Sequence, residues 1–383
     1  MMTHPFHLLI VFLGIISVVL TLTGRFKTAA KISPVILILF FSALLSNTKI
    51  LPTDSGFYKT LLGYAVPFAV CQILLQVRFS DIKKTGLPVL KAFAVASTGS
   101  VVGCLVAGIL LNDKLNGLLD GQGWKLAGPY IGTYIGGSLN FFSMWTGLDI
   151  DSPELFAAAN AIDNLTLIPI FVFWVMAPQF LRRWYRQTEI EIAVETPQTA
   201  PSPAVLKIND LVMLTFIGVL VMAASEFIKA RLFNSWMPQM PTIMIVTTMA
   251  LVIAQFKTVK QLQGAKELGN VAFYLFFAAI GAMMDILNAI RLAPILFVYV
   301  VIILLSQILF VLLVGRLLKM DLRMLAVASI AAKAGPSTVV AYVNAKEWND
   351  LALPGVAAAL LGYAIGNYAA LAGVYLLRFI VTG

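Results

Sequence analysis

Long apolar segments, separated by short polar stretches, fill most of the 383-residue chain. A helix needs about 20 apolar residues to cross the hydrocarbon core of a bilayer. By that measure the pattern predicts two sets of six helices and an all-α polytopic membrane protein. The first set covers 6–23, 33–47, 57–77, 87–111, 125–146 and 154–179, and the second covers 209–228, 240–256, 269–288, 293–315, 323–345 and 353–379.

The composition supports this membrane location. Hydrophobic residues make up 60% of the chain and charged residues only 12%, whereas soluble domains are about half apolar and a quarter charged. The net charge of +9 lies mainly in short loops, which indicates cytoplasmic anchoring rather than nucleic-acid binding. We therefore expect a multi-pass protein of the plasma (inner) membrane, with the lipid bilayer and no nucleic acid as a partner.

A polar stretch divides the two sets of helices. Residues 187–206 are acidic and then rich in proline and threonine, a composition typical of a surface linker. The sequence thus predicts a first transmembrane repeat over 1–186, a polar linker over 187–206 and a second transmembrane repeat over 207–383.

The two repeats share a sequence echo. Gly136-Gly137-Ser138-Leu139-Asn140 precedes Asn160-Ala161-Ile162-Asp163-Asn164, and Gly335-Pro336-Ser337-Thr338 precedes Tyr363-Ala364-Ile365-Gly366-Asn367. Each copy is a glycine and serine break in an apolar segment, followed by a helix that carries Ala-Ile-x-Asn. Paired, interrupted segments at matching positions indicate the substrate site of a secondary transporter.

Basic residues indicate that the repeats run in opposite directions. They follow the first and third spans of one repeat and the second and fourth spans of the other, namely Arg25, Lys27, Lys31, Arg78, Lys83 and Lys84, then Lys257, Lys260, Lys266, Arg316, Lys319 and Arg323. Inversion needs an odd number of crossings, so six spans conflict with it, as do Arg182, Arg183 and Arg186 after the sixth span. One span must be miscounted, either the short 33–47 segment or a break that re-enters the membrane. We expect about 11–13 transmembrane helices in inverted repeats.

The breaks place polar oxygens near mid-membrane. Non-helical backbone survives in hydrocarbon only against protein or a watery cavity. Freed carbonyls and half-helix C-termini suit a cation, and half-helix N-termini suit a carboxylate. A single glycine cluster would more often serve close helix packing, but two clusters at matching positions favour a site. Neutral oxygens of the kind that replace the water of a sodium ion come from Thr133, Ser138, Asn140, Ser337 and Thr338.

Two charges are expected within the membrane. Asp163 shares a helix face with Asn160 and Asn164, and an acid at that depth is a functional candidate by default. Its structural alternative is a buried acid that hydrogen-bonds the asparagines. Lys333, two residues before Gly335, can pair with Asp163, offer a counter-charge to an anionic substrate, or snorkel to the interface. In the echo, Asp163 aligns with Gly366 and Lys333 aligns with Tyr134.

Cysteine and histidine positions provide no pattern for catalysis or metal binding. Cys71 and Cys104 lie inside apolar runs, and His4 and His7 lie at the N-terminus. The sequence therefore has no disulfide framework, zinc-type metal motif or Ser-His-Asp arrangement. We expect no enzyme activity, no catalytic residues, no cofactor and no metal beyond sodium as a coupling ion.

Four segments resemble the domain-of-unknown-function 819 family of bacterial membrane proteins, and the resemblance covers essentially the whole chain. They are GTYIGGSLNF at 132–141, AxNAIDN at 158–164, AAKAGPSTVVAY at 331–342 and GYAIGN at 362–367. By resemblance the family is grouped with the cation/proton antiporter and anion transporter superfamily, which also holds bile-acid/sodium symporters. This implies two inverted repeats, broken helices that cross near the midplane, and elevator-like movement of a core domain against a panel domain.

The resemblance also bears on individual residues. The implied crossover falls at Gly136-Gly137-Ser138 and Gly335-Pro336-Ser337. In the antiporter branch an acidic residue follows the crossover helix, and Asp163 has that place. Many proton antiporters carry a second aspartate where Asn164 stands, so this departure favours symport. Dimerisation is common in the implied fold, which leaves a homodimer open.

The leading prediction is an ion-coupled secondary transporter, a sodium symporter of a small organic, anionic solute. Sodium would bind the broken-helix oxygens with Asn164 and Asn367, and the solute would bind near Lys333. The second hypothesis is a cation/proton antiporter in which Asp163 carries protons and sodium. An integral-membrane enzyme or a scaffold is a third class, with little support. The candidate substrate- and ion-binding residues are Thr133, Gly136, Gly137, Ser138, Asn140, Asn160, Asp163, Asn164, Lys333, Gly335, Pro336, Ser337, Thr338, Tyr363 and Asn367.

Overall fold

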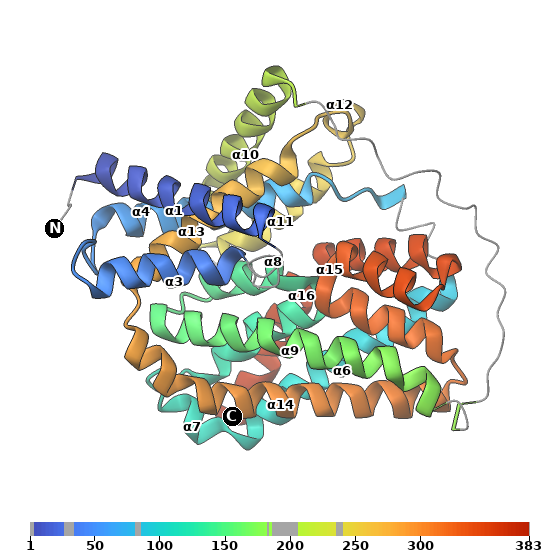
Figure 1. Cartoon of the computed structure of the whole chain (residues 1–383). Coiled ribbons are helices and arrows are strands. Elements are labelled where there is room, and N and C mark those ends of the chain that lie inside the picture. The colour runs from blue at the N-terminus through green and yellow to red at the C-terminus, as the bar shows by residue number, and fades with distance from the viewer. Residues whose placement is uncertain are drawn as a thin grey trace.

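The computed structural model describes residues 4–26, 34–80, 86–181, 184–185, 206–234 and 240–382. Their regular secondary structure is helical (Figure 1). Seven of the described helices are long and apolar enough to cross a membrane, and two shorter apolar helices accompany them. These features confirm the predicted all-α polytopic membrane fold.

The described helices of 12 or more residues form two series of six. The first comprises α1 (Pro5–Arg25), α3 (Pro34–Asn47), α4 (Gly56–Leu74), α6 (Leu87–Leu110), α8 (Ala127–Gly147) and α9 (Pro153–Phe180). The second comprises α10 (Ile208–Ile228), α11 (Thr242–Ile253), α13 (Ala265–Met283), α14 (Ile286–Leu317), α15 (Leu322–Lys346) and α16 (Ala352–Thr382). Short helical segments between them include α7 (Asn112–Asn116) and α12 (Lys257–Lys260).

Helix α8 folds back on itself and does not cross the bundle. Its helical backbone is interrupted at Gly136 and at Gly137, which has φ 69° and ψ −176°. A Cβ atom on Gly132 would lie 2.8 Å from the Asn140 carbonyl oxygen, and one on Gly128 would touch the far end of the element, near residue 148. Residues 128 and 148 would be about 30 Å apart in a straight helix. Helix α8 is therefore a hairpin of two packed helical arms.

Helix α15 is a second hairpin, broken at Gly335 with φ 76° and ψ 179°. Arg323 near its start lies 3.8 Å from the carboxylate of Asp350, just beyond its end. Val327 and Val339, one from each arm, both contact the same glycine of α16. Both ends of α15 therefore lie at one face of the bundle.

The two hairpins meet tip to tip. A Cβ atom on Gly137 would lie 4.0 Å from the Gly335 nitrogen. The breaks thus come together as the resemblance implies, but each broken element returns to the face from which it came. The predicted spans 125–146 and 323–345 are therefore not crossings. Of the two ways in which a span could be miscounted, re-entry is correct at both breaks, and 33–47 corresponds to the separate helix α3.

Removing the hairpins from the count leaves five crossings among the described helices of each repeat: α1, α3, α4, α6 and α9, then α10, α11, α13, α14 and α16. The described part of the chain therefore has ten crossing helices and two re-entrant hairpins, where 11–13 transmembrane helices were expected. The Asp285 N–H donates to Glu154 over 3.3 Å, which places the starts of α9 and α14 at one face. Arg78 donates to the Lys260 carbonyl over 3.1 Å, which places the ends of α4 and α11 at the other face. An odd number of crossings makes the second repeat run opposite to the first, so the repeats are inverted.

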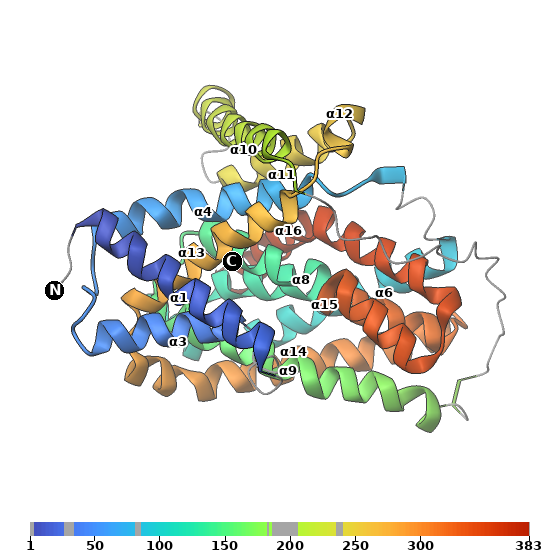
Figure 2. The same ribbon diagram turned by 45° about the horizontal axis from the view of Figure 1, so that its top comes forward.

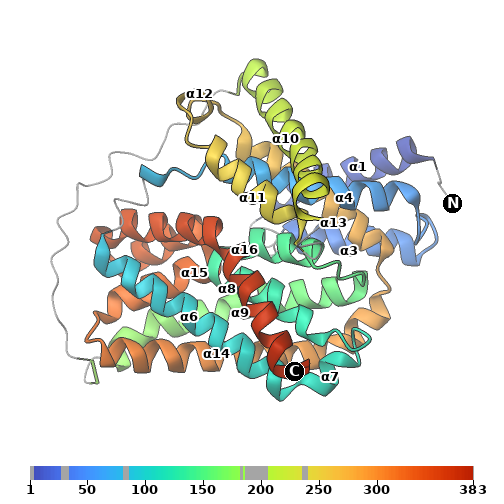
Figure 3. The same cartoon turned by 180° about the vertical axis from the view of Figure 1, so that it is seen from behind.

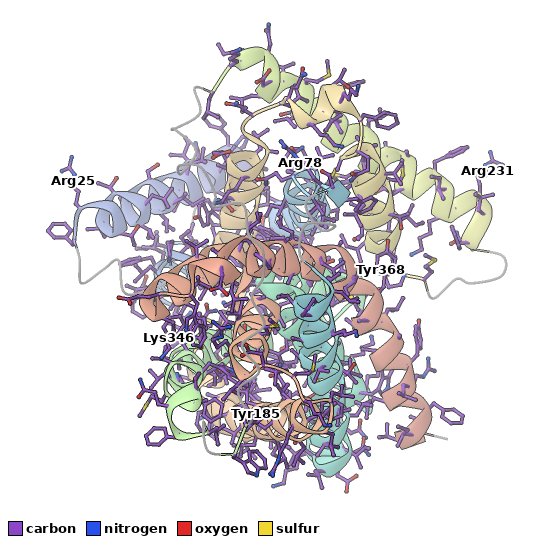
Figure 4. All side chains as sticks on the ribbon, turned by 90° about the vertical axis from the view of Figure 1, so that its right-hand side faces the viewer. Arg25, Arg78, Tyr185, Arg231, Lys346 and Tyr368 are labelled. Atoms are coloured by element: carbon purple, nitrogen blue, oxygen red, sulfur yellow. The ribbon has the colours of Figure 1, made fainter. Side chains whose placement is uncertain are left out.

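This path brings the described basic residues of the prediction to one face. We call it the basic face, and it carries Arg25, Arg78, Lys257, Lys260, Lys266, Arg316, Lys319 and Arg323. Figure 4 looks at the molecule from this side, with Arg25 and Arg78 labelled. By the positive-inside rule we expect the basic face to be cytoplasmic, and we call the opposite one the outer face. The other predicted markers lie outside the described residues: Lys27, Lys31, Lys83, Lys84, Arg182, Arg183 and Arg186.

The helices form two groups. Helices α1, α3, α4, α10, α11 and α13 contact one another in one group, which we call the panel helices. Helices α6, α8, α9, α14, α15 and α16 form the other, which we call the core helices. The panel helices occupy most of the upper part of Figures 1 and 3 and the core helices most of the lower part, and in Figure 2 the panel helices are turned toward the viewer. This division matches the core and panel that the resemblance implies.

The outer surface of the bundle is apolar where it faces lipid. Ile208 on α10 is 78% exposed, and Leu317 on α14 is 79% exposed. Exposed apolar side chains of this kind need no water-shielding partner in a bilayer. The repeat boundaries at 1–186 and 207–383 stay predictions, because residues 186–205 of the linker region lie outside the described ranges.

Candidate functional site

A cavity of about 440 Å³ lies where the hairpin tips meet the panel helices. Its walls combine neutral polar groups, one acid, one lysine and several aromatic rings. The core side is lined by Gly137, Ser138, Leu139, Phe142, Asp163, Asn164, Leu167, Lys333, Ala334 and Tyr363, and the panel side by Pro34, Val35, Ile73, Asn270, Phe273, Tyr274 and Phe277. The cavity thus lies between the two groups of helices.

The cavity extends toward the basic face. Among its panel residues, Val35 lies at the start of α3, Ile73 at the end of α4 and Asn270 in the first half of α13. These three helix segments all lie on the basic-face side of the bundle. The structure therefore has its site accessible from the inferred cytoplasmic side.

Packed aromatic rings close the site toward the outer face. The Phe142 ring of α8 lies 4.7 Å from that of Phe277 on α13, measured between centroids. The Phe156 ring of α9 lies 5.3 Å from that of Phe276 on the same panel helix. Edge-to-face pairs at these distances add about 0.5–1.5 kcal/mol each beyond area burial. We call these four rings and Phe273 the aromatic closure.

The centre of the site is a buried ion pair. Lys333 Nζ lies 2.5 Å from Asp163 Oδ1, and each residue is 5% exposed. The ammonium also lies 3.9 Å from the centroid of the Tyr134 ring, and Thr133 donates a 3.2 Å hydrogen bond to Asp163 Oδ2. Removal of one partner from a buried pair typically destabilises a protein by about 3–5 kcal/mol, because the other charge is left uncompensated. Of the three roles considered for Lys333, pairing with Asp163 is the one observed.

The hairpin geometry changes the alignment of the echo. Gly137 and Gly335 have φ of 69° and 76° and ψ of −176° and 179°, so they are equivalent. Lys333, two residues before its break, therefore corresponds to Ile135 and not to Tyr134. Tyr134 instead provides the ring against which the ammonium packs.

The predicted asparagine face of α9 is present. Asn164 lines the cavity, and its Nδ2 donates to the carbonyl oxygen of Asn160 over 2.8 Å and to its Oδ1 over 3.2 Å. Asn160 is 1% exposed, and its Nδ2 has no hydrogen-bond partner among the described residues. This helix face therefore brings the Asn164 amide beside Asp163 in the cavity wall, while Asn160 lies behind Asn164.

Two other predicted ligands, Asn140 and Asn367, are not among the described residues that line the cavity. Asn140 donates to the Gly362 carbonyl over 3.1 Å and tethers the α8 hairpin to α16. Asn367 donates to Thr247 of α11 over 3.0 Å. Both side chains are fully buried, and each leaves its Oδ1 without a partner among the described residues. They join elements to one another and do not line the cavity.

The remaining predicted residues belong to the hairpin tips. Gly136 packs against Gly362, where a Cβ atom would collide with the carbonyl. Pro336 and Thr338 lie in the second arm of α15 and are not among the described cavity-lining residues. The side chain of Ser337 lies outside the described part of the chain.

Several residues of the site escaped the sequence prediction. Asn270 is a polar residue inside an apolar segment, and this was the signal by which it could have been found. Tyr134 and the rings of the aromatic closure carry no such signal, because an aromatic side chain in an apolar span is indistinguishable from ordinary packing.

Comparison with known proteins assigns the chain to a family. Residues 8–379 match the family model described as "Protein of unknown function (DUF819)". The chain is also 28% identical over 364 residues to the "Uncharacterized membrane protein YjcL" of Bacillus subtilis (strain 168), a match that covers 91% of this chain and 90% of that protein. The chain is therefore a multi-pass membrane protein that belongs to the DUF819 family.

Proposed function

We propose that the protein is an ion-coupled secondary transporter of a small organic solute, with sodium as the coupling ion. The observation that carries this proposal is the buried Asp163–Lys333 pair, which lies in the wall of a cavity between two groups of helices. Charges inside membrane proteins are expensive to bury, and they characteristically mark ion and substrate pathways. Two hairpins that break at this depth supply the irregular backbone that transporter sites use.

Sodium binding is supported by the oxygens around Asp163. Ser138 and Asn164 line the same cavity and offer neutral oxygens beside the carboxylate, and hard oxygen ligands suit small alkali cations. Asn367, which the sequence suggested as a sodium ligand, donates its Nδ2 to Thr247 and is not among the described residues that line this cavity. We therefore place sodium on the Asp163 side, with Lys333 on the side of an anionic solute.

A cation/proton antiporter is the second candidate. The contact between Asp163 and Lys333 favours antiport as well. The Lys333 ammonium lies 2.5 Å from the Asp163 carboxylate and can lose its proton when a cation takes its place. Antiport is disfavoured by Asn164, which stands where a second acid would strengthen cation binding. An integral-membrane enzyme or a scaffold has less support, because the described lining pairs no nucleophile with a histidine base.

The test is uptake into proteoliposomes under an imposed sodium gradient, with a set of radiolabelled monocarboxylates, dicarboxylates and amino acids. Symport predicts sodium-dependent accumulation of one solute class, lost in Asp163→Asn and retained in the control Asp54→Asn, whose side chain is 72% exposed. Sodium-driven proton movement without organic solute would instead support antiport. Absence of both activities over a broad pH range would contradict the transporter proposal.

A further inference from the structure

The Asp163–Lys333 pair has a consequence for coupling. We propose that this pair is a charge-exchange lock, which admits one monovalent cation and one monoanionic solute only together. The inference rests on the proposed transport function and specifies its solute class and stoichiometry. On binding, the carboxylate of Asp163 passes from Lys333 to the cation, and the ammonium of Lys333 passes to the anionic group of the solute.

The cation side of the lock is already organised around Asp163. Thr133 holds Oδ2 at 3.2 Å, while Oδ1 faces Lys333 at 2.5 Å. Asn164 uses its Nδ2 for Asn160, which leaves its carbonyl oxygen as the atom for an ion. A cation that replaced the ammonium would meet the acid and this amide from the cavity, which Ser138 also lines.

The anion side is organised around Lys333. Its ammonium lies 3.9 Å from the Tyr134 ring centroid and 3.3 Å from the backbone carbonyl of Asp163. Neither contact supplies a full negative charge, so an ammonium freed from Asp163 Oδ1 would still need an anion. The cavity beside it offers Asn270 and Tyr363 for hydrogen bonds. Phe142, Phe273 and Phe277 provide an apolar wall for the body of the solute.

The charge balance sets the stoichiometry. Asp163 and Lys333 are the charged residues in the described lining, and their charges, −1 and +1, sum to zero. As long as Lys333 keeps its proton and Asp163 stays ionised, a cation alone would displace the ammonium and leave it without a partner, and an anion alone would do the same to the carboxylate. Low dielectric penalises either state strongly. Loss of the Lys333 proton to a cation alone is the antiport alternative. One cation with one monoanion converts one ion pair into two and keeps the site neutral.

The first experiment measures binding to the purified wild-type protein. Sodium chloride alone, each member of a set of small monocarboxylates, dicarboxylates and zwitterionic amino acids alone, and each combination are compared by thermal shift and by ²²Na⁺ binding, with choline chloride as the ionic control. We expect sodium to tighten monocarboxylate binding by about tenfold or more. The monocarboxylate should tighten sodium binding by the same factor, because coupling between two binding sites is reciprocal. Sodium binding with the same affinity with and without every solute would overturn the proposal.

The second experiment separates the two sides of the lock. Asp163→Asn leaves Lys333 unpaired, so monocarboxylate binding is expected to persist without sodium dependence. Lys333→Gln leaves Asp163 unpaired, so sodium binding is expected to persist without solute dependence. The double variant Asp163→Asn/Lys333→Gln keeps the site neutral and is expected to fold while binding neither ligand tightly. If either single variant fails to fold, the reciprocity measured on the wild-type protein decides the proposal by itself.

The third experiment distinguishes failure of the lock from failure of the proposed function. Uptake into proteoliposomes is measured under a sodium gradient with and without a membrane potential set by valinomycin and potassium. Electroneutral uptake that the potential does not change supports the lock. Sodium-driven uptake that carries net charge overturns the lock and leaves the transport function standing, whereas absence of all sodium-driven uptake contradicts both.

Discussion

Gly137 and Gly335 hold the two hairpin tips in a conformation that other residues rarely adopt. Their φ angles of 69° and 76° are combined with ψ near 180°, a region that is essentially restricted to glycine. The two positions differ in their surroundings. A Cβ atom on Gly137 would meet nothing nearer than 3.5 Å, whereas one on Gly335 would lie 2.7 Å from the Tyr363 hydroxyl. A substitution of Gly137 therefore measures how much the backbone conformation alone contributes to stability.

We expect Gly137→Ala to destabilise the protein by about 1–3 kcal/mol through backbone strain alone. Gly335→Ala should destabilise it further, because it adds the contact with Tyr363. Thermal unfolding in detergent measures both. Gly14→Ala is the matched control, since that helical position has open space around it, and there alanine should be neutral or slightly stabilising. Equal stability of the Gly137 and Gly14 variants would contradict the role given to the tip.

The site residues were predictable to different degrees. Asp163 and Lys333 stood out because charges are rare in apolar segments, yet their pairing joins residues 170 positions apart, and no local pattern encodes such a contact. Asn140 and Asn367 were predicted as ligands because amides near a break are good ligands. The direction of each side chain depends on what α8 and α16 pack against, so the sequence could not show that their Nδ2 atoms donate to Gly362 and Thr247.

At the scale of elements, the aromatic closure separates the site from the outer face. Phe142 and Phe156 come from core helices, whereas Phe276 and Phe277 come from the panel helix α13. The rings therefore join the two groups of helices on one side of the cavity only. A change of access requires these contacts to part, so they stabilise the arrangement that is open toward the basic face.

We expect Ser138→Cys, in a background without Cys71 and Cys104, to react with a membrane-impermeant thiol reagent from the basic face. Ser138 lines the cavity and is exposed, while both native cysteines are fully buried. Adding Phe277→Ala should raise the rate of labelling from the outer face by about tenfold. Removal of this ring would cost the closed state about 1.4 kcal/mol, and that amount raises the ratio of open to closed molecules about tenfold. Inside-out and right-side-out vesicles distinguish the two directions.

Phe171→Ala is the control for that measurement. Phe171 packs edge-on against Tyr342, 5.5 Å between centroids and away from the closure. It should leave labelling of Ser138→Cys unchanged from both sides. Outer labelling that is already fast with Phe277 in place would show that the rings do not close the site.

For the molecule as a whole, the sequence predicted the two repeats and their inversion but not how inversion is achieved. The apolar lengths of 125–146 and 323–345 are those of spans, and hydropathy does not distinguish a crossing helix from a hairpin of two half-length arms. Six spans per repeat conflicted with the positions of the basic residues, which indicated that a span was miscounted. Re-entry of a broken segment was one of the two explanations for that miscount. Deciding between them required the contacts between the two arms of each hairpin.

The resulting path places both described ends of the chain, His4 and Thr382, at the outer face. We expect alkaline phosphatase fused to the C-terminus to be active and a green fluorescent protein fused there to be dark. The opposite result is expected for fusions after Leu262, which follows α12 at the basic face. A fluorescent C-terminal fusion would mean that one of the hairpins crosses the membrane after all.

The five-crossing repeat also bears on how the protein could be divided. A half-molecule with an odd number of crossings begins and ends on opposite sides, so its own basic residues determine its orientation without help from the other half. Two separately translated halves would then insert in opposite directions and bring their tip glycines together from opposite sides of the membrane. The single polypeptide is thus equivalent to an antiparallel heterodimer whose two subunits happen to be covalently joined.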